Sequence, residues 1–277
     1  MAFTVTTLME NTSPRAELAA EHGLSLLIEG GGRRILYDAG PSPRFLFNAR
    51  AMGVSLDGLD ALVISHSHYD HPGGAAALLA RPEKPAAIYV GREFFTPRFG
   101  RREDGRYCEV GSVLEQCAIT AAKVPCRVVG SEPVALGNGV WLVSGFDSLE
   151  DMEMPTDAMV RKTEAGLEAD PFTEELAVVL ELQEGLALIS GCSHTGVVSM
   201  CRALQNRFGR PVTVFVGGTH LMGADSDRIR RTCLRLRELG VKQLGACHCS
   251  GEAACTHFEA NFPGFFRNNV GTRLVLE

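Results

Sequence analysis

The chain alternates between short apolar runs and longer stretches whose apolar positions recur every three or four residues. Short runs that end in Gly, Asp, Ser or His, such as RRILYDAG and ALVISH, predict β-strands. Stretches with the longer spacing, such as PRFLFNARAMG, predict helices. In the first half, strands are expected near residues 3–9, 25–30, 34–39, 61–65 and 86–91, with helices over 43–53 and 73–80.

The pattern becomes more regular along the rest of the chain. Three apolar runs, CRVVG, PVALG and VWLVSG, indicate meandering strands around Val140. LAVVLEL and GLALISG then predict a hairpin that turns at Gln183 and Glu184. Further along, we expect helices over 196–209, 225–240 and 254–262, and strands over 212–218, 241–248 and 272–277.

Two segments lack a clear pattern. Residues 98–111 are polar and rich in glycine, which predicts a long loop. Residues 146–172 are strongly acidic and predict a second loop, either a solvated surface segment or a lid over a site. Because no Pro- or Ser-rich linker and no repeat interrupts the chain, we expect residues 1–277 to form one domain.

Composition narrows the class of protein. The chain has 277 residues, 45% of them hydrophobic, and its formal net charge is −6. This excludes a mainly disordered chain and argues against nucleic-acid binding, since no basic run offsets the acidic balance. No apolar stretch is long enough for a membrane span, and the N-terminus is unlike a signal peptide, so a cytoplasmic location is expected. Nine cysteines, an odd number, argue against a disulfide framework.

Side chains that can bind a metal are concentrated where the strand ALVIS ends. The sequence HSHYDHPGG brings His66, His68, Asp70 and His71 into six residues. So many polar ligand groups are costly to bury unless they have partners. An extended backbone would point His66 and His68 to the same side, and the following turn could present Asp70 and His71 to a second point. The cluster therefore predicts a metal site.

The string HSHYDH resembles the HxHxDH signature of the metallo-β-lactamase superfamily, and the resemblance extends over nearly the whole chain. MEN, EHGLSLLIE, SGCSHTG, GGTHL and ACHCSG are similar to a subgroup described as dihydropteroate-synthase-like or ribofuranosylaminobenzene 5′-phosphate synthase-like. The resemblance implies an αββα sandwich, in which two mixed β-sheets are flanked by helices and a metal pair lies at one edge. It assigns His66 and His68 to one metal, Asp70 and His71 to the other, and a ligand-orienting role to Asp38.

The downstream part departs from the common family pattern, because no Gly-Asp supplies a bridging carboxylate. His194, in SGCSHTG, is the expected metal contact, and Cys192 is either a thiolate substitute for the bridging Asp or a buried thiol. His248 follows a late strand and is expected to close the second metal's shell. His220 is either structural or functional, and we place it with Asp70 among the candidate catalytic residues.

An alternative interpretation of the region around His248 is a structural zinc site. Cys247, Cys249, Cys255 and His257 could form such a site, although they lack the usual CxxC pair. In an extended strand, the thiols of Cys247 and Cys249 would lie on the face opposite the His248 imidazole. This geometry favours His248 as a ligand of the metal pair and leaves the cysteines elsewhere.

These features predict a metal-dependent hydrolase. Two divalent ions, Zn or alternatively Mn or Fe, would generate a metal-bound hydroxide that attacks an ester, thioester, lactam or phosphoester. The expected partner is a small molecule, with anionic and pterin-related substrates both open, and no nucleic acid or membrane is expected. A homo-oligomer is compatible with the sequence. The alternatives are a di-iron oxidoreductase and a non-catalytic metal-containing sensor.

Overall fold

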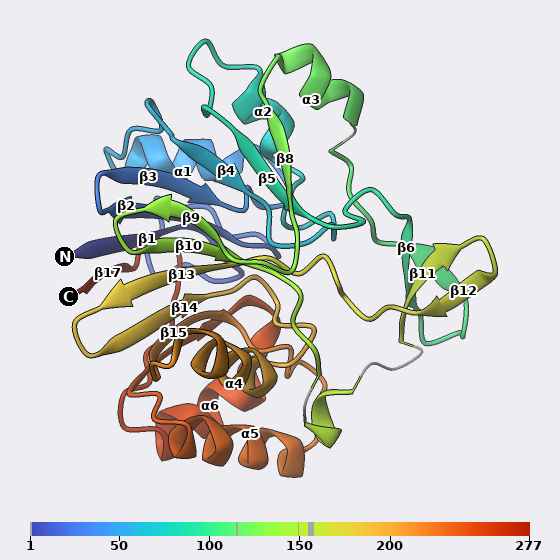
Figure 1. The fold of residues 1–277 in the computed structure, drawn as a ribbon, viewed down its shortest axis with the longest axis vertical. Coiled ribbons are helices and arrows are strands. Elements are labelled where there is room, and N and C mark those ends of the chain that lie inside the picture. Colours follow the sequence, from blue (N-terminus) through green and yellow to red (C-terminus); the bar gives the residue numbers. More distant parts are fainter. Residues whose placement is uncertain (1, 115, 149, 155–157) are drawn as a thin grey trace.

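A computed structural model describes residues 2–114, 116–148, 150–154 and 158–277. Two mixed β-sheets lie face to face at its centre, with helices on their outer faces (Figure 1). The first sheet has the order β17-β1-β2-β3-β4-β5-β8, antiparallel from β17 to β3 and parallel from β3 to β8. Its strands are β1 (Phe3–Met9), β2 (Ser25–Gly30), β3 (Arg33–Tyr37), β4 (Ala61–Val63), β5 (Ile88–Gly91), β8 (Cys126–Val129) and β17 (Arg273–Leu276).

The second sheet has the order β16-β15-β14-β13-β10-β9. β14, β15 and β16 run parallel, whereas β13, β10 and β9 continue the sheet with antiparallel pairs. The predicted hairpin is confirmed as β13 and β14. The strands of this sheet are β9 (Val134–Gly137), β10 (Val140–Val143), β13 (Ala177–Leu182), β14 (Gly185–Ile189), β15 (Val212–Gly218) and β16 (Gln243–Cys247).

Three buried clusters hold these layers together. The central cluster lies between the sheets and joins Val5 and Leu26 of the first sheet to Leu142, Val178 and Val216 of the second. One outer cluster packs α1 (Arg44–Ala51), α2 (Ala75–Leu79) and α3 (Gln116–Ala122) on the first sheet. The other packs α4 (Val197–Phe208), α5 (Ser226–Glu238) and α6 (Glu252–Asn261) on the second sheet. The expected αββα sandwich is confirmed.

A third, four-stranded antiparallel sheet lies beside the sandwich (Figure 1). It consists of β6 (Arg98–Arg101), β7 (Tyr107–Glu109), β11 (Met159–Thr163) and β12 (Gly166–Ala169). The prediction of a loop over 98–111 is therefore wrong. The prediction of a loop over 146–172 is wrong in part, because this segment holds β11, β12 and the 3₁₀ turn η1 (Asp151–Glu153), while residues 149 and 155–157 lie outside the described part.

Two further differences concern the first half of the chain. The run CRVVG does not join a meander, because β8 pairs in parallel with β5 in the first sheet while β9 and β10 belong to the second. α3 had no counterpart in the prediction, since only Ile119 of this short helix is buried and its apolar stripe is weak. In the described part of the chain, the helices are too short or too polar to cross a membrane.

Candidate metal centre

The HSHYDH segment follows β4 and folds into tight turns that gather its side chains. His66, His68, Asp70 and His71 are all buried. The ring centroid of His66 lies 4.7 Å from that of His68 and 4.1 Å from that of His71. The expected strand ends at Val63. It is therefore the turns after β4, and not an extended strand, that bring the imidazoles to one point.

Asp38 and Ser65 lie behind two of these imidazoles. The Ser65 hydroxyl donates to Asp38 Oδ2 at 2.7 Å, so it accepts from His66 Nδ1 at 2.9 Å. Asp38 Oδ2 also accepts from His71 Nδ1 at 2.6 Å. A proton held at Nδ1 leaves Nε2 of the neutral ring with a free lone pair, which is how outer partners prepare histidine for a metal. The expected orienting role of Asp38 agrees with this geometry.

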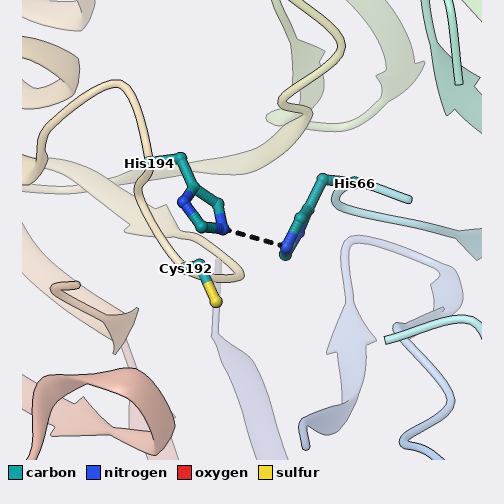
Figure 2. A group of neighbouring side chains, drawn as sticks. All are labelled: His66, Cys192 and His194. Atoms are coloured by element: carbon teal, nitrogen blue, oxygen red, sulfur yellow. Dashed lines mark hydrogen bonds between the residues drawn. The ribbon is translucent and has the colours of Figure 1, made fainter. Parts of the chain in front are cut away.

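The loop after β14 adds Cys192 and His194 to the cluster (Figure 2). His194 Nε2 lies 3.2 Å from His66 Nε2, and Cys192 Sγ lies 3.3 Å from His71 Nε2. The donor atoms of His66, Cys192 and His194 lie within 4.8 Å of one another, and so do those of His71, Cys192 and His248. The Cys192 thiol is therefore common to two donor groups.

This loop is held close to the motif by two contacts. Glu175 accepts hydrogen bonds from the backbone N–H groups of His194 and Thr195 at 2.7 and 2.9 Å. At Gly191 the backbone passes so close to Ser65 that a Cβ would lie 2.2 Å from the Ser65 hydroxyl oxygen. A side chain at position 191 would push the loop away from the histidines, which explains the glycine of SGCSHTG.

Asp70 and His248 meet on the other side of Cys192, together with His22. Nε2 of His248 and Nε2 of His22 each lie 3.3 Å from Asp70 Oδ2, and Nε2 of His71 lies 4.0 Å from the same oxygen. His22, Asp70 and His248 thus form a third group of neighbouring donors. Sequence reasoning missed His22, and its only signal was the EHG string that contributed to the family resemblance.

His68 and His220 flank His194. Nε2 of His68 is buried and has no hydrogen-bond partner. Phe172 stacks on His194 with a centroid distance of 4.0 Å and an interplanar angle of 4°, and the His220 ring lies 4.2 Å from His194 on a tilted plane. The structure therefore brings His66, His68, Asp70, His71, His194, His220 and His248 into one cluster.

The electrostatics of the cluster favour neutral imidazoles and added positive charge. Burial lowers the pKa of His68 to about 3 and the pKa of both His220 and His248 to about 4. His71 differs: although burial opposes its charged form, the carboxylates of Asp38 and Asp70 raise its pKa to about 9. The two buried carboxylates therefore favour the protonated, positively charged form of His71.

The rival cysteine site does not form. Cys247 Sγ accepts from Asn268 Nδ2 at 3.5 Å, while the Cys249 thiol donates to the Cys192 carbonyl at 3.4 Å, so the two thiols serve different surroundings. The expectation that they share one face of a strand is wrong, because His248–Ser250 is a 3₁₀ turn. Among the residues that the structure describes, Cys247, Cys249, Cys255 and His257 do not converge as a donor group.

The donor set fits divalent metal ions. Two nitrogen ligands bound tetrahedrally at about 2.0–2.1 Å would lie roughly 3.3 Å apart, close to the separations found here. Imidazole nitrogen, thiolate and carboxylate suit zinc, and imidazoles also suit iron. The buried Nε2 atoms of His68 and His248 have no hydrogen-bond partner, and bound metal ions would satisfy them.

Comparisons with known proteins agree with the fold. A synthase from Methanocaldococcus jannaschii, 7,8-dihydropterin-6-methyl-4-(β-D-ribofuranosyl)-aminobenzene-5′-phosphate synthase, is 28% identical over 266 residues, which is 92% of this chain and 90% of the relative. The solved structure of a metal-dependent hydrolase of the β-lactamase superfamily matches with a TM-score of 0.84 at 27% identity, covering 98% of both chains.

A more distant match shows the fold alone. Zn²⁺-bound PqqB from Methylobacterium extorquens superposes with a TM-score of 0.60 at 13% identity, covering 98% of this chain and 99% of that one. The family model described as the metallo-β-lactamase superfamily matches residues 19–208. This stretch includes the HSHYDH cluster and the SGCSHTG loop. The chain therefore belongs to the metallo-β-lactamase superfamily.

Proposed function

We propose that this protein is a metal-dependent hydrolase that uses two divalent metal ions, most readily zinc, with manganese and iron as alternatives. One observation carries the proposal. Cys192 Sγ belongs to two groups of buried donor atoms, one with His66 and His194 and the other with His71 and His248. A thiol placed between two donor groups is what a two-metal site requires of a shared ligand.

The residues divide naturally between the two ions. His66, His68 and His194 would hold one ion, and Asp70, His71 and His248 the other. Cys192 would lie between the ions, in the position where other members use a bridging carboxylate. When bound, such a metal pair polarises a carbonyl or phosphoryl oxygen and makes a water molecule nucleophilic near neutral pH.

Two residues have candidate roles in the reaction itself. Although burial opposes it, the charge of His71 and the hydrogen bond of His22 lower the pKa of Asp70, so its carboxylate is ionised and can accept a hydrogen bond from the attacking water. His220 is neutral at pH 7 and only partly buried, so its ring can bind substrate beside His194. In hydrolysis, water adds to the acyl carbon or phosphorus, the bond to the leaving oxygen, sulfur or nitrogen breaks, and that atom gains a proton.

The site and the synthase-type relative both support a class of substrate. The reaction would cleave an ester, thioester, lactam or phosphoester of a small molecule. The likeness to the M. jannaschii enzyme over most of both chains favours a pterin-related or phosphate-bearing compound. The same likeness supports a second candidate, a synthase that joins such a compound to a second substrate.

The test begins with the metal. The purified protein should contain up to two equivalents of a divalent ion, and chelation should abolish turnover of bis-p-nitrophenyl phosphate, an acyl thioester or a chromogenic lactam. Turnover that survives complete metal removal would refute the hydrolase. Iron with a visible absorption band would favour the redox alternative. Bound metal without hydrolysis of the panel, but with consumption of a pterin and an aminobenzene phosphate, would favour the synthase.

His68→Ala tests the ligand assignment within the same experiment. The buried Nε2 of His68 has no partner other than the proposed ion. The variant should stay folded and retain less metal after dialysis than the parent protein. Undiminished metal content in the His68→Ala protein would contradict the assignment.

A further inference from the structure

Two strings that set this sequence apart, MEN and EHG, meet at His248. Asn11, the last residue of MEN, forms four hydrogen bonds through its side-chain amide. Two of them go to the backbone of Gly23 and His248, and two go to ring nitrogens of His22 and His248. Glu10 adds a fifth contact, since its Oε1 accepts from the His248 backbone N–H at 2.8 Å.

The backbone contacts determine which way the Asn11 amide points. A backbone N–H can only donate and a carbonyl can only accept. The Gly23 N–H donates to Asn11 Oδ1 at 3.2 Å, and the His248 carbonyl accepts from Asn11 Nδ2 at 3.3 Å. Exchanging the oxygen and nitrogen of the amide would break both contacts, so the orientation does not depend on how the histidines are protonated.

This orientation assigns opposite tautomers to the two histidines. His248 Nδ1 lies 3.0 Å from the acceptor Oδ1, so it carries the proton and leaves Nε2 with a free lone pair. His22 Nδ1 lies 3.2 Å from the donor Nδ2, so it accepts, and the proton of the neutral ring sits on Nε2. Both Nε2 atoms lie 3.3 Å from Asp70 Oδ2, but only that of His22 can donate to the carboxylate.

We infer that Asn11 is a positioning residue that makes His248 a metal ligand and His22 a hydrogen-bond donor to Asp70. By distance alone His22 could be a ligand, because it forms a donor group with Asp70 and His248. The hydrogen bonds of Asn11 decide against that role. The His22 side chain is 50% exposed, so it holds the Asp70 carboxylate from the solvent side of the site. The ligand role of His248 rests on the proposed function, whereas the two tautomers do not.

The tautomers can be measured without any metal. Full-length protein labelled with ¹⁵N-histidine, freed of metal and held at about pH 8.5, where an ordinary imidazole is neutral, would be studied by long-range ¹H–¹⁵N NMR. Spectra of His22→Gln and His248→Gln would assign the two rings. We expect the proton on Nε2 in His22 and on Nδ1 in His248.

Asn11→Asp tests whether the amide sets these states. The substitution replaces the donor Nδ2 with a second acceptor of similar size, so His22 Nδ1 should gain a proton while His248 Nδ1 keeps its own. Asn269→Asp makes the same change beside the neighbouring Thr12, which it contacts through Oδ1, and should leave both rings as they are. A His22 Nδ1 already protonated in the parent protein, or unchanged in Asn11→Asp, would overturn the inference.

Zinc titration then separates a donor from a ligand. His22→Ala should bind as many zinc equivalents as the parent protein, with affinity for one equivalent reduced about 10- to 100-fold, the effect typical of lost outer partners. His22→Gln, whose amide can still donate to Asp70, should restore most of that affinity. Loss of a whole equivalent in His22→Ala, or unchanged affinity, would refute the positioning role. If the parent protein binds no zinc, the proposed function fails while the NMR result still decides the tautomers.

Discussion

Several residues of the candidate metal centre have unusual backbone angles, which set the directions of their side chains. Asp38, Ser193, His220 and His248 all have positive φ, between 49° and 59°. Such angles are uncommon for residues other than glycine and carry a cost of order 1 kcal/mol each. The surrounding hydrogen bonds maintain these angles, as Glu10 does at the His248 N–H. Strand periodicity could not have predicted the directions of these side chains.

Residue by residue, the sequence predicted the members of the cluster better than their geometry. The HSHYDH string, His194 and His248 were recognisable because motif and strand-end position both indicate ligands. His22 was not, since its contact with His248 joins residues 226 positions apart and no local pattern encodes it. The position of Cys192 between two donor groups likewise emerges only when the loop after β14 packs on the motif.

For single residues, we predict that His248→Ala and His257→Ala will differ in their affinity for metal. His248 Nε2 faces Asp70 and the donor group of Cys192, so its removal should lower affinity for one metal equivalent of two and reduce any activity with it. His257 lies on α6 outside the described donor groups and should tolerate the change. Zinc titration of both apoproteins checks this, and equal behaviour of the two variants would contradict the ligand assignment.

At the scale of elements, the sandwich could be predicted and the side sheet could not. Strands buried on both faces, such as β14 and β15, give continuous apolar runs that are easy to recognise. β12, by contrast, is exposed along its whole length, and β6 begins with an arginine, a residue that usually indicates solvent. Arg98 is instead fully buried. The long-range pairing of the side-sheet strands is not visible in the local sequence pattern.

Arg98 connects the side sheet to the metal-binding motif. Its Nε lies 2.6 Å from Asp170 Oδ2 and 3.1 Å from Glu174 Oε1, and its Nη1 donates to the Ser67 hydroxyl at 3.1 Å. Ser67 stands between His66 and His68 and also donates to Glu174. Strand β6 therefore supports the loop that carries two of the proposed ligands, His66 and His68.

We predict that Arg98→Met will destabilise the protein strongly and weaken metal binding. Removing one partner of a buried ion pair typically costs about 3–5 kcal/mol, because the remaining carboxylate stays buried without compensation. Arg161→Met, on β11 of the same sheet, breaks pairs with the exposed Glu93 and Glu168 and should cost about 1 kcal/mol or less. Denaturant unfolding and zinc titration measure both effects. Similar losses in the two variants would mean that Arg98 acts only as a surface charge.

At the scale of the whole molecule, buried glutamates connect the layers around the centre. Glu153 accepts from Val198 and Ser199 at the start of α4, and Glu175 accepts from the backbone of the His194 loop. Glu174 accepts from the Ser67 N–H and hydroxyl at 3.0 and 2.9 Å. Burial raises the pKa of all three carboxyl groups. Because the folded protein holds these protons more tightly than the unfolded chain, the free energy of unfolding should fall as pH rises.

Glu174 allows the sign of that effect to be tested. Burial outweighs the attraction of Arg98 and raises the pKa of Glu174 from 4.5 to about 8. Between these values the unfolded chain releases a proton that the folded protein keeps, so the free energy of unfolding falls as pH rises, by up to about 1.4 kcal/mol per pH unit for this group. Below pH 4.5 and above pH 8 this contribution is constant.

Glu174→Gln should therefore flatten the decline in unfolding free energy between pH 5 and pH 8, because glutamine has no proton to lose and its carbonyl can still accept from Ser67. Relative to the parent protein, the variant should gain on the order of a few kcal/mol across that interval. Glu184→Gln, at an exposed side chain paired with Lys242, should keep the parental slope. Urea unfolding at four pH values is sufficient, and parallel curves for Glu174→Gln and the parent would show that Glu174 is already ionised in the folded protein, held by Arg98 as a true ion pair.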